Sequence, residues 1–266
     1  MRTVLKAKSI YDNADVAAVW AGIQSYVTED EAWDAVEQAI AEVRSVVGND
    51  RDRVVYGWSG GKDSLALQAV MERAGIRRAV LGTIPAMEWH QYLEWVNFNQ
   101  PDGLTTIPNY DLDLRWLSAN PRFLFPRDHK AGYRWTLAGT RRAQLRYQAI
   151  HKPIMQIYGR RRADGNVIGQ EAYGIQRSRN LVAYNPLRDW SHELVLAVIH
   201  YARLELPPVY DWPHGWTAGT GAWPGRRIGT IDESWAETWQ IEPDRVREAA
   251  AHIGDARRWM AETGVS

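Results

Sequence analysis

The chain has 266 residues, no cysteine and a formal net charge of zero, with 32 Lys and Arg against 32 Asp and Glu. The absence of cysteine excludes disulfides, thiolate nucleophiles and Cys-ligated zinc or iron–sulfur clusters held by the chain itself. No apolar run approaches the ~20 residues that span a bilayer, and no signal-peptide core follows the N-terminus, so we expect a cytoplasmic protein that contacts no membrane.

Residues 1–48 are predicted to form a helical extension. Thr28 and Glu31 have the spacing of a capping box, in which each side chain accepts a hydrogen bond from the other residue's backbone N–H. Apolar residues then recur at helical spacing, at Trp33, Val36, Ile40, Val43 and Val47.

Residues 49–210 are predicted to form an α/β domain, because strand and helix patterns alternate along them. The expected strands are residues 53–57, 78–84, 104–107, 153–159 and 181–184, and the expected helices are residues 62–74, 87–97, 136–150 and one that starts after Ser191. This alternation is typical of a doubly wound, mainly parallel sheet. Residues 211–266 are predicted to form a Trp-rich loop region followed by one or two helices from Pro243.

The residues Ser59-Gly60-Gly61-Lys62-Asp63-Ser64 lie where the first strand turns into a helix. Two glycines allow a tight turn, and the start of a helix directs backbone N–H groups and the positive end of its dipole at the same point. Such a turn is predicted to bind phosphate. The serine hydroxyls and the Lys62 ammonium would contact phosphate oxygens, and Asp63 would hold Mg²⁺ through water or position the lysine.

A strand followed by this motif and a helix resembles the PP-loop of the N-type ATP pyrophosphatases, the adenine nucleotide α-hydrolase-like superfamily. The resemblance implies an adenine nucleotide site that uses ATP and Mg²⁺, with nucleotide-binding residues at 59–64 and catalytic roles for Lys62 and Asp63. Such enzymes cleave ATP between the α and β phosphates to adenylate an acceptor.

Within that superfamily, the later segments resemble the phosphoadenosine phosphosulfate (PAPS) reductase-like family. The strand 154–158 is followed by Gly159 and by the arginines 160–162, and the segment 185–191 precedes a helix and a Leu-Pro-Pro-Val-Tyr run at 206–210. Open α/β sheets bind ligands at the carboxyl ends of their strands. We therefore expect Arg160 and Arg161 to hold pyrophosphate or the charge that develops in the transition state.

Two features depart from the family pattern. Family reductases use a C-terminal cysteine, which this chain lacks, so reductase chemistry is excluded. Where the family's second strand often ends in an acidic residue, this sequence has Gly82-Thr83-Ile84, and Glu88 is the nearest carboxylate.

The segment 121–162 carries eleven basic residues and one acid, Asp128. This is more positive charge than one nucleotide requires, so the segment indicates a second anionic partner: a nucleic acid, an acidic protein surface, or the acidic N-terminal helix of another subunit in a homo-oligomer. The basic residues are Arg122, Arg127, Lys130, Arg134, Arg141, Arg142, Arg146, Lys152, Arg160, Arg161 and Arg162.

The sequence therefore predicts an ATP-binding PP-loop enzyme that transfers an adenylyl group and releases pyrophosphate. Sulfate, a small carboxylate and a nucleic-acid group remain open as acceptors. The alternative is a protein that binds nucleotide without catalysis, or a regulatory or modification-complex component associated with nucleic acid.

Overall fold

The computed structural model describes residues 3–5, 12–178 and 181–266. The chain divides into two compact units. Unit 1 comprises Met1–Leu81, Phe98–Thr105 and Tyr147–Pro207, and unit 2 comprises Gly82–Asn97, Thr106–Arg146 and Pro208–Ser266. Within unit 1, the helix at Glu29–Val47 (α2) packs against the helices at Lys62–Ala74 (α3) and His192–Tyr201 (α8).

Six strands form one sheet within the described residues, in the order β3-β2-β1-β4-β6-β5. They are β1 (Val54–Gly57), β2 (Ala79–Thr83), β3 (Leu104–Pro108), β4 (Met155–Ile157), β5 (Gln176–Arg177) and β6 (Val182–Tyr184). Strand β1 runs parallel to β2 and β4, β4 runs parallel to β6, and the two-residue β5 pairs antiparallel with β6. The predicted doubly wound α/β class is confirmed, whereas β5 was not predicted.

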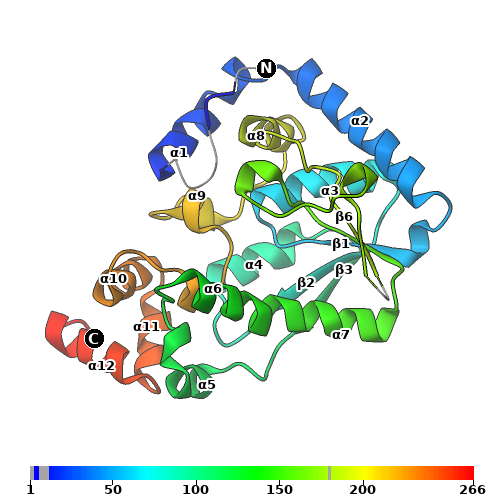
Figure 1. The fold of residues 1–266 in the computed structure, drawn as a ribbon. Helices are drawn as coiled ribbons and strands as arrows, with labels where there is room; N and C mark the ends of the chain where they lie inside the picture. Colours follow the sequence, from blue (N-terminus) through cyan, green and yellow to red (C-terminus); the bar gives the residue numbers. More distant parts are fainter. Residues whose placement is uncertain (1–2, 6–11, 179–180) are drawn as a thin grey trace. The chain divides into compact units, whose positions relative to one another are not determined.

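The helices of unit 1 are α1 (Asn13–Ala21), α2 (Glu29–Val47), α3 (Lys62–Ala74) and α8 (His192–Tyr201). Figure 1 shows α2, α3 and α8 together on one face of the strands of this unit, and the three contact one another. The predicted capping box is confirmed, because Thr28 and Glu31 exchange hydrogen bonds at the start of α2. The apolar stripe of α2 is buried from Val36 to Val47, and Ser191 caps α8 by accepting a hydrogen bond from the Leu194 N–H.

The helices of unit 2 are α5 (Leu114–Ala119), α6 (His129–Thr136), α9 (Gly215–Ala218), α10 (Ile231–Ile241), α11 (Pro243–Ala250) and α12 (Gly254–Thr263). Helices α4 (His90–Asn99) and α7 (Arg142–His151) have residues in both units. Short 3-10 turns lie at Ile23–Ser25, Arg51–Arg53, Pro121–Phe123, Arg162–Asp164, Ala172–Gly174, Pro208–Tyr210 and Trp223–Gly225.

Two predicted elements of unit 2 need correction. The basic helix expected at residues 136–150 begins at His129 instead, because the Asp128 carboxylate caps the Ala131 N–H, and a π-helical turn at Leu137–Arg141 joins α6 to α7. The Trp-rich region is not all loop. Trp235 and Trp239 lie on α10, which a Thr230–Glu233 capping box starts.

None of the helices in the described ranges combines the length and the apolar character that crossing a bilayer would require.

Candidate functional site

The predicted phosphate-binding turn lies entirely in unit 1, between the end of β1 at Gly57 and the start of α3 at Lys62. Gly60 has φ of +63°, in the left-handed region that glycine adopts without steric cost. Gly61, the residue before α3, has an extended backbone and no side chain with which to cap the helix. The positive end of the dipole of this 13-residue helix lies at the backbone N–H groups of its first turn. Gly61 has no side chain that would accept hydrogen bonds from these groups.

Two serines brace the turn. Ser64 Oγ donates a hydrogen bond to the Gly61 carbonyl oxygen at 2.9 Å and accepts one from the Ser59 N–H at 3.1 Å. Ser59 Oγ accepts from the Gly61 N–H at 3.4 Å. Ser64 is buried and Ser59 is exposed, so Ser64 holds the turn while the Ser59 hydroxyl lies at the surface where a ligand would contact it.

Behind the turn lies a network of two buried cations, Lys62 and Arg161, and two carboxylates, of which Asp63 is partly exposed. Lys62 Nζ lies 2.8 Å from Asp63 Oδ2 and 3.6 Å from Asp164 Oδ1. Arg161 Nε donates to Asp63 Oδ1 at 2.7 Å, and its Nη2 lies 2.8 Å from Asp164 Oδ2. The Arg161 side chain is fully buried and Lys62 is nearly so. The structure thus brings the predicted residues Lys62, Asp63 and Arg161 together around Asp164.

The charges of this network keep Asp63 ionised. Burial would raise the pKa of Asp63, but the charges and hydrogen bonds of Lys62 and Arg161 outweigh it and lower this pKa to about 2. The Asp63 carboxylate is therefore a stable acceptor at neutral pH. In this arrangement it joins Lys62 on α3 to Arg161 in the loop after β4.

His192 completes the network in its neutral form. Its Nδ1 lies 3.3 Å from Arg161 Nη2, and because a guanidinium only donates, Nδ1 accepts this hydrogen bond. The proton is therefore on Nε2, which donates to the Ala163 carbonyl oxygen at 3.2 Å. Burial lowers the pKa of His192 below its ordinary 6.5, and the positive charges of Arg161 and Lys62 lower it further.

The three consecutive arginines have different environments. Arg161 is enclosed, since its Nη1 also donates to the Trp190 carbonyl oxygen at 3.1 Å. Arg162 pairs with Asp189. Arg160 is exposed, its guanidinium carbon lies 4.5 Å from the Tyr158 ring centroid, and it forms no ion pair with any described residue. Of the two arginines predicted to hold pyrophosphate or transition-state charge, Arg160 is therefore exposed, while Arg161 holds Asp63 and Asp164.

A close backbone approach explains the glycine before these arginines. A Cβ on Gly159 would lie 2.7 Å from the Asp63 carbonyl oxygen, a distance that real Cβ atoms do not show. Only glycine lets the loop after β4 pack this closely on the first turn of α3.

We therefore expect Gly159→Ala to lower the free energy of unfolding by about 1–3 kcal/mol, the usual effect of overpacking. It should also weaken nucleotide binding, because the Asp63 backbone must shift. Gly57→Ala is the matched control, since its Cβ would make an ordinary contact 3.5 Å from the Tyr158 ring. Chemical denaturation of both variants measures the difference, and equal stabilities would contradict the close-approach argument.

Two members of the site, Asp164 and His192, were not predicted from the sequence. Asp164 lies three residues after Arg161 and His192 directly follows the Ser191 cap of α8, but neither spacing alone indicates a contact with the turn at residues 59–64. Only the packing of these segments brings them to Lys62 and Arg161.

The neutral state of His192 predicts a pH dependence of stability. Unfolded His192 titrates near 6.5, whereas the folded side chain has a lower pKa, so protons bind the unfolded state more strongly. The stability that neutral His192 contributes is present above pH 6.5 and is lost as the pH falls below it, by up to about 1.4 kcal/mol per pH unit.

We expect the free energy of unfolding of the parent protein to fall more steeply between pH 7 and pH 5 than that of His192→Asn, which keeps one donor and one acceptor. Glu88 acts oppositely, since burial raises its pKa to about 7 against the lowering effects of the Ile84 N–H and Arg245. Glu88 is present in both proteins and cancels in the difference. Parallel pH profiles would exclude a neutral His192.

Glu88 itself closes the turn after β2 in unit 2. It is buried, and its Oε1 accepts a hydrogen bond from the Ile84 N–H at 3.0 Å. No group of three or more His, Asp or Glu side chains in the part of the chain that the structure describes is arranged to hold a metal ion.

The basic segment 121–162 is shared between the two units. Residues 121–146 belong to unit 2, and residues 147–162 belong to unit 1. Arg146 is engaged inside unit 2 by Asp111, whose Oδ2 lies 2.6 Å from Nη2. The eleven basic residues therefore do not form one site within either unit.

Solved structures with a similar fold include phosphoadenylyl-sulfate (PAPS) reductase from Candida auris in a phosphate complex, with a TM-score of 0.52 and 12% sequence identity over 76% of this chain and 98% of that chain. The U34-tRNA thiolase NcsA from Methanococcus maripaludis has a TM-score of 0.47 and 14% identity over 97% of this chain and 89% of that one. Yeast FAD synthetase in complex with FAD has a TM-score of 0.47 and 10% identity over 94% and 92%.

No protein-family model and no curated protein matches the sequence. At 12% identity, the likeness to PAPS reductase concerns the fold alone. It confirms the fold that the resemblance of residues 59–64 and 154–191 to this family predicted. The chain therefore shares the α/β fold of PAPS reductase.

Proposed function

We propose that this protein binds ATP at the turn 59–64 and cleaves its α–β phosphate bond, transferring the adenylyl group to an acceptor in the cytoplasm and releasing pyrophosphate. The observation that carries the proposal is the left-handed turn at Gly60, which leads from the end of β1 to the N-terminus of α3, where the N-cap residue Gly61 has no side chain. Backbone N–H groups arranged in this way favour a phosphate group.

Each residue of the site has a role in this proposal. The first-turn N–H groups of α3 and the Ser59 hydroxyl hold phosphate oxygens, and Lys62 and the exposed Arg160 neutralise charge on the departing pyrophosphate. An acceptor oxygen forms a bond to the α phosphorus while the bond from that phosphorus to the bridging oxygen of the β phosphate breaks. Arg161 is a positioning residue, because it fixes the Asp63 carboxylate against Lys62.

Mg²⁺ is part of the proposal, and the donors at the turn fit only a cation that arrives with the phosphates. Both Asp63 carboxylate oxygens already accept from cations, Arg161 at 2.7 Å and Lys62 at 2.8 Å. Mg²⁺ usually keeps several waters and binds through substrate phosphates, so Asp63 would reach it through water. The ion would supply further neutralisation of phosphate charge.

Product analysis tests the proposal. ATP labelled at the α phosphate should yield labelled AMP or an adenylylated acceptor, together with an equal amount of pyrophosphate. Separate reactions with sulfate, small carboxylates, DNA and RNA identify the acceptor class. The Lys62→Ala variant controls for a contaminating ATPase, and ADP as the main product would contradict the proposal.

A second candidate function is nucleotide binding without catalysis. The observation that favours it is the charge balance of the network, in which Asp63 and Asp164 already neutralise Lys62 and Arg161. Such a site could hold a nucleotide through α3 and Arg160 alone. Calorimetric ATP binding with no labelled product in any of the four acceptor reactions would support this candidate over the enzyme.

A further inference from the structure

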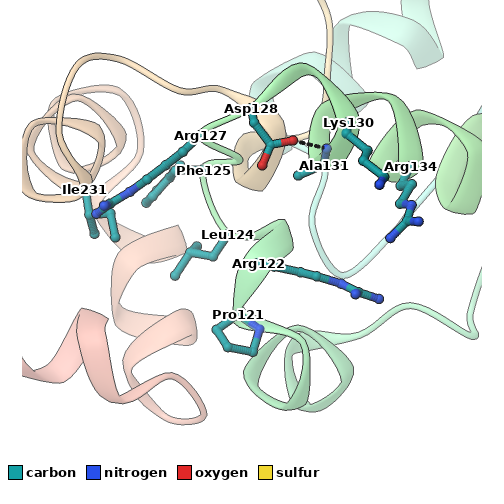
Figure 2. Close-up of a pocket in the computed structure, with 10 residues that line it drawn as sticks. All are labelled: Pro121, Arg122, Leu124, Phe125, Arg127, Asp128, Lys130, Ala131, Arg134 and Ile231. Carbon is teal, nitrogen blue, oxygen red and sulfur yellow. Dashed lines mark hydrogen bonds between the residues drawn. The ribbon is translucent and has the colours of Figure 1, made fainter.

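Unit 2 contains a pocket of about 330 Å³ whose polar lining is almost entirely cationic. Four basic side chains line it, Arg122, Arg127, Lys130 and Arg134 (Figure 2). None of them belongs to the ATP site proposed above, whose residues all lie in unit 1.

The four cations of the pocket have no carboxylate partner among the residues that the structure describes. All four side chains are exposed, and none forms an ion pair with a described residue, although the Arg122 guanidinium lies 4.8 Å from the Phe123 ring centroid. The pocket's one carboxylate, Asp128, accepts a hydrogen bond from the Ala131 N–H at 2.7 Å and caps α6 (Figure 2). Like charges in a concave site repel one another, and a bound anion reduces this repulsion. The positive electrostatic potential of such a site also raises the local concentration of anions.

The arrangement favours side-chain contacts to more than one anionic group. Lys130 and Arg134 lie one helical turn apart on α6, so they share a face of the helix. Figure 2 shows Arg122 extending to the same side of the pocket as these two, whereas Arg127 extends toward Ile231 on the other side. Because Asp128 already caps α6, the helix terminus is not the anion's main partner.

The rest of the lining is apolar, from Pro121, Leu124, Phe125, Ala131 and Ile231. An apolar wall beside placed charges is typical of a small-molecule site, and such sites have volumes of roughly 300–1,000 Å³. The pocket is thus large enough for one nucleotide-sized group with a ring against the apolar wall.

We propose that this pocket is a second anion site, which binds a ligand of nucleotide size that carries two or more negative charges on phosphate groups. Such groups occur on free nucleotides and along nucleic-acid strands, and the basic side chains would contact both in the same way. The proposal does not depend on ATP cleavage, since no pocket residue belongs to the turn 59–64.

The test uses the full chain carrying Lys62→Ala and Ser59→Ala, so that anion binding at the turn is weakened. Inorganic pyrophosphate and a short single-stranded DNA are titrated at low salt, by calorimetry and fluorescence anisotropy. The pocket variant is Lys130→Gln with Arg134→Gln. The matched control is Arg141→Gln with Arg142→Gln, which removes the same total charge from the following helical segment outside the pocket.

We expect the pocket variant to bind pyrophosphate at least about tenfold more weakly, because hydrogen bonds to charged groups are individually strong. The control should stay within about twofold of the parent. If the natural ligand is a nucleic acid, DNA affinity also falls in the pocket variant alone, and its salt slope decreases by about 0.7 for each lost phosphate contact. If the ligand is a free nucleotide, only pyrophosphate binding falls.

Either pattern supports the pocket. Unchanged affinity for both anions in the pocket variant, or an equal loss in the control, would overturn it. Thermal unfolding verifies that each variant is folded. Should the first pocket variant unfold, Arg122→Gln with Arg127→Gln must reproduce the loss in a folded protein, and the absence of any loss there would also overturn the proposal.

Discussion

Replacing Arg161 by alanine is expected to lower the free energy of unfolding by about 3–5 kcal/mol, the usual cost of removing one partner from a buried ion-pair network. The Arg161 side chain is fully buried, and its guanidinium contacts Asp63 Oδ1 at 2.7 Å and Asp164 Oδ2 at 2.8 Å. Without it, Asp164 would keep Lys62 Nζ at 3.6 Å and His192 Nδ1 at 3.8 Å, and the Trp190 carbonyl oxygen would lose a donor.

Urea denaturation of Arg161→Ala and Arg160→Ala measures this difference on adjacent residues. Arg160 is exposed, so its replacement should change stability by less than about 0.5 kcal/mol while reducing turnover of ATP. The two arginines thus separate stability from function. Equal destabilisation by the two replacements would refute the assignment of Arg161 as the buried positioning residue.

Replacing both Lys62 and Ser59 by alanine is expected to weaken ATP binding by about 2–4 kcal/mol, or roughly 30- to 1,000-fold, because charge-assisted contacts contribute ~1.5–3 kcal/mol each and are not additive. Lys62 provides the cation at the start of α3 and Ser59 the exposed hydroxyl of the turn. The α3 backbone N–H groups remain, so some affinity should persist.

The matched control is Ser45→Ala with Lys152→Ala, which removes the same two groups from exposed positions elsewhere in unit 1. Isothermal titration calorimetry with ATP and Mg²⁺ compares the two double variants with the parent. ATP affinity that is the same in all three proteins would remove the turn 59–64 from nucleotide binding, whatever the products of the reaction.

Most strands and helices follow from local patterns. The strand at β1, the turn at residues 58–61 and helix α3 lie within a residue of the expected positions, because strand burial, glycine geometry and a helix start are all determined by neighbours in sequence. The errors have local causes too. Asp128 starts α6 earlier than the apolar pattern indicates, and the Thr230–Glu233 capping box forms a helix where Trp, Gly and Pro suggested a loop.

The sequence by itself determined the geometry of the turn at residues 59–64, since the φ of Gly60, the missing side chain of Gly61 and the Ser59–Ser64 hydrogen bonds all arise within six residues. Only the tertiary structure decided which arginine is buried and which is exposed. Three consecutive arginines are chemically alike, and burial against α3 and α8 makes Arg161 the partner of Asp63, Asp164 and His192 while Arg160 stays at the surface. Packing likewise divides one basic segment between two units and places four of its cations around a pocket, because long-range contacts determine which charges meet a carboxylate among the described residues.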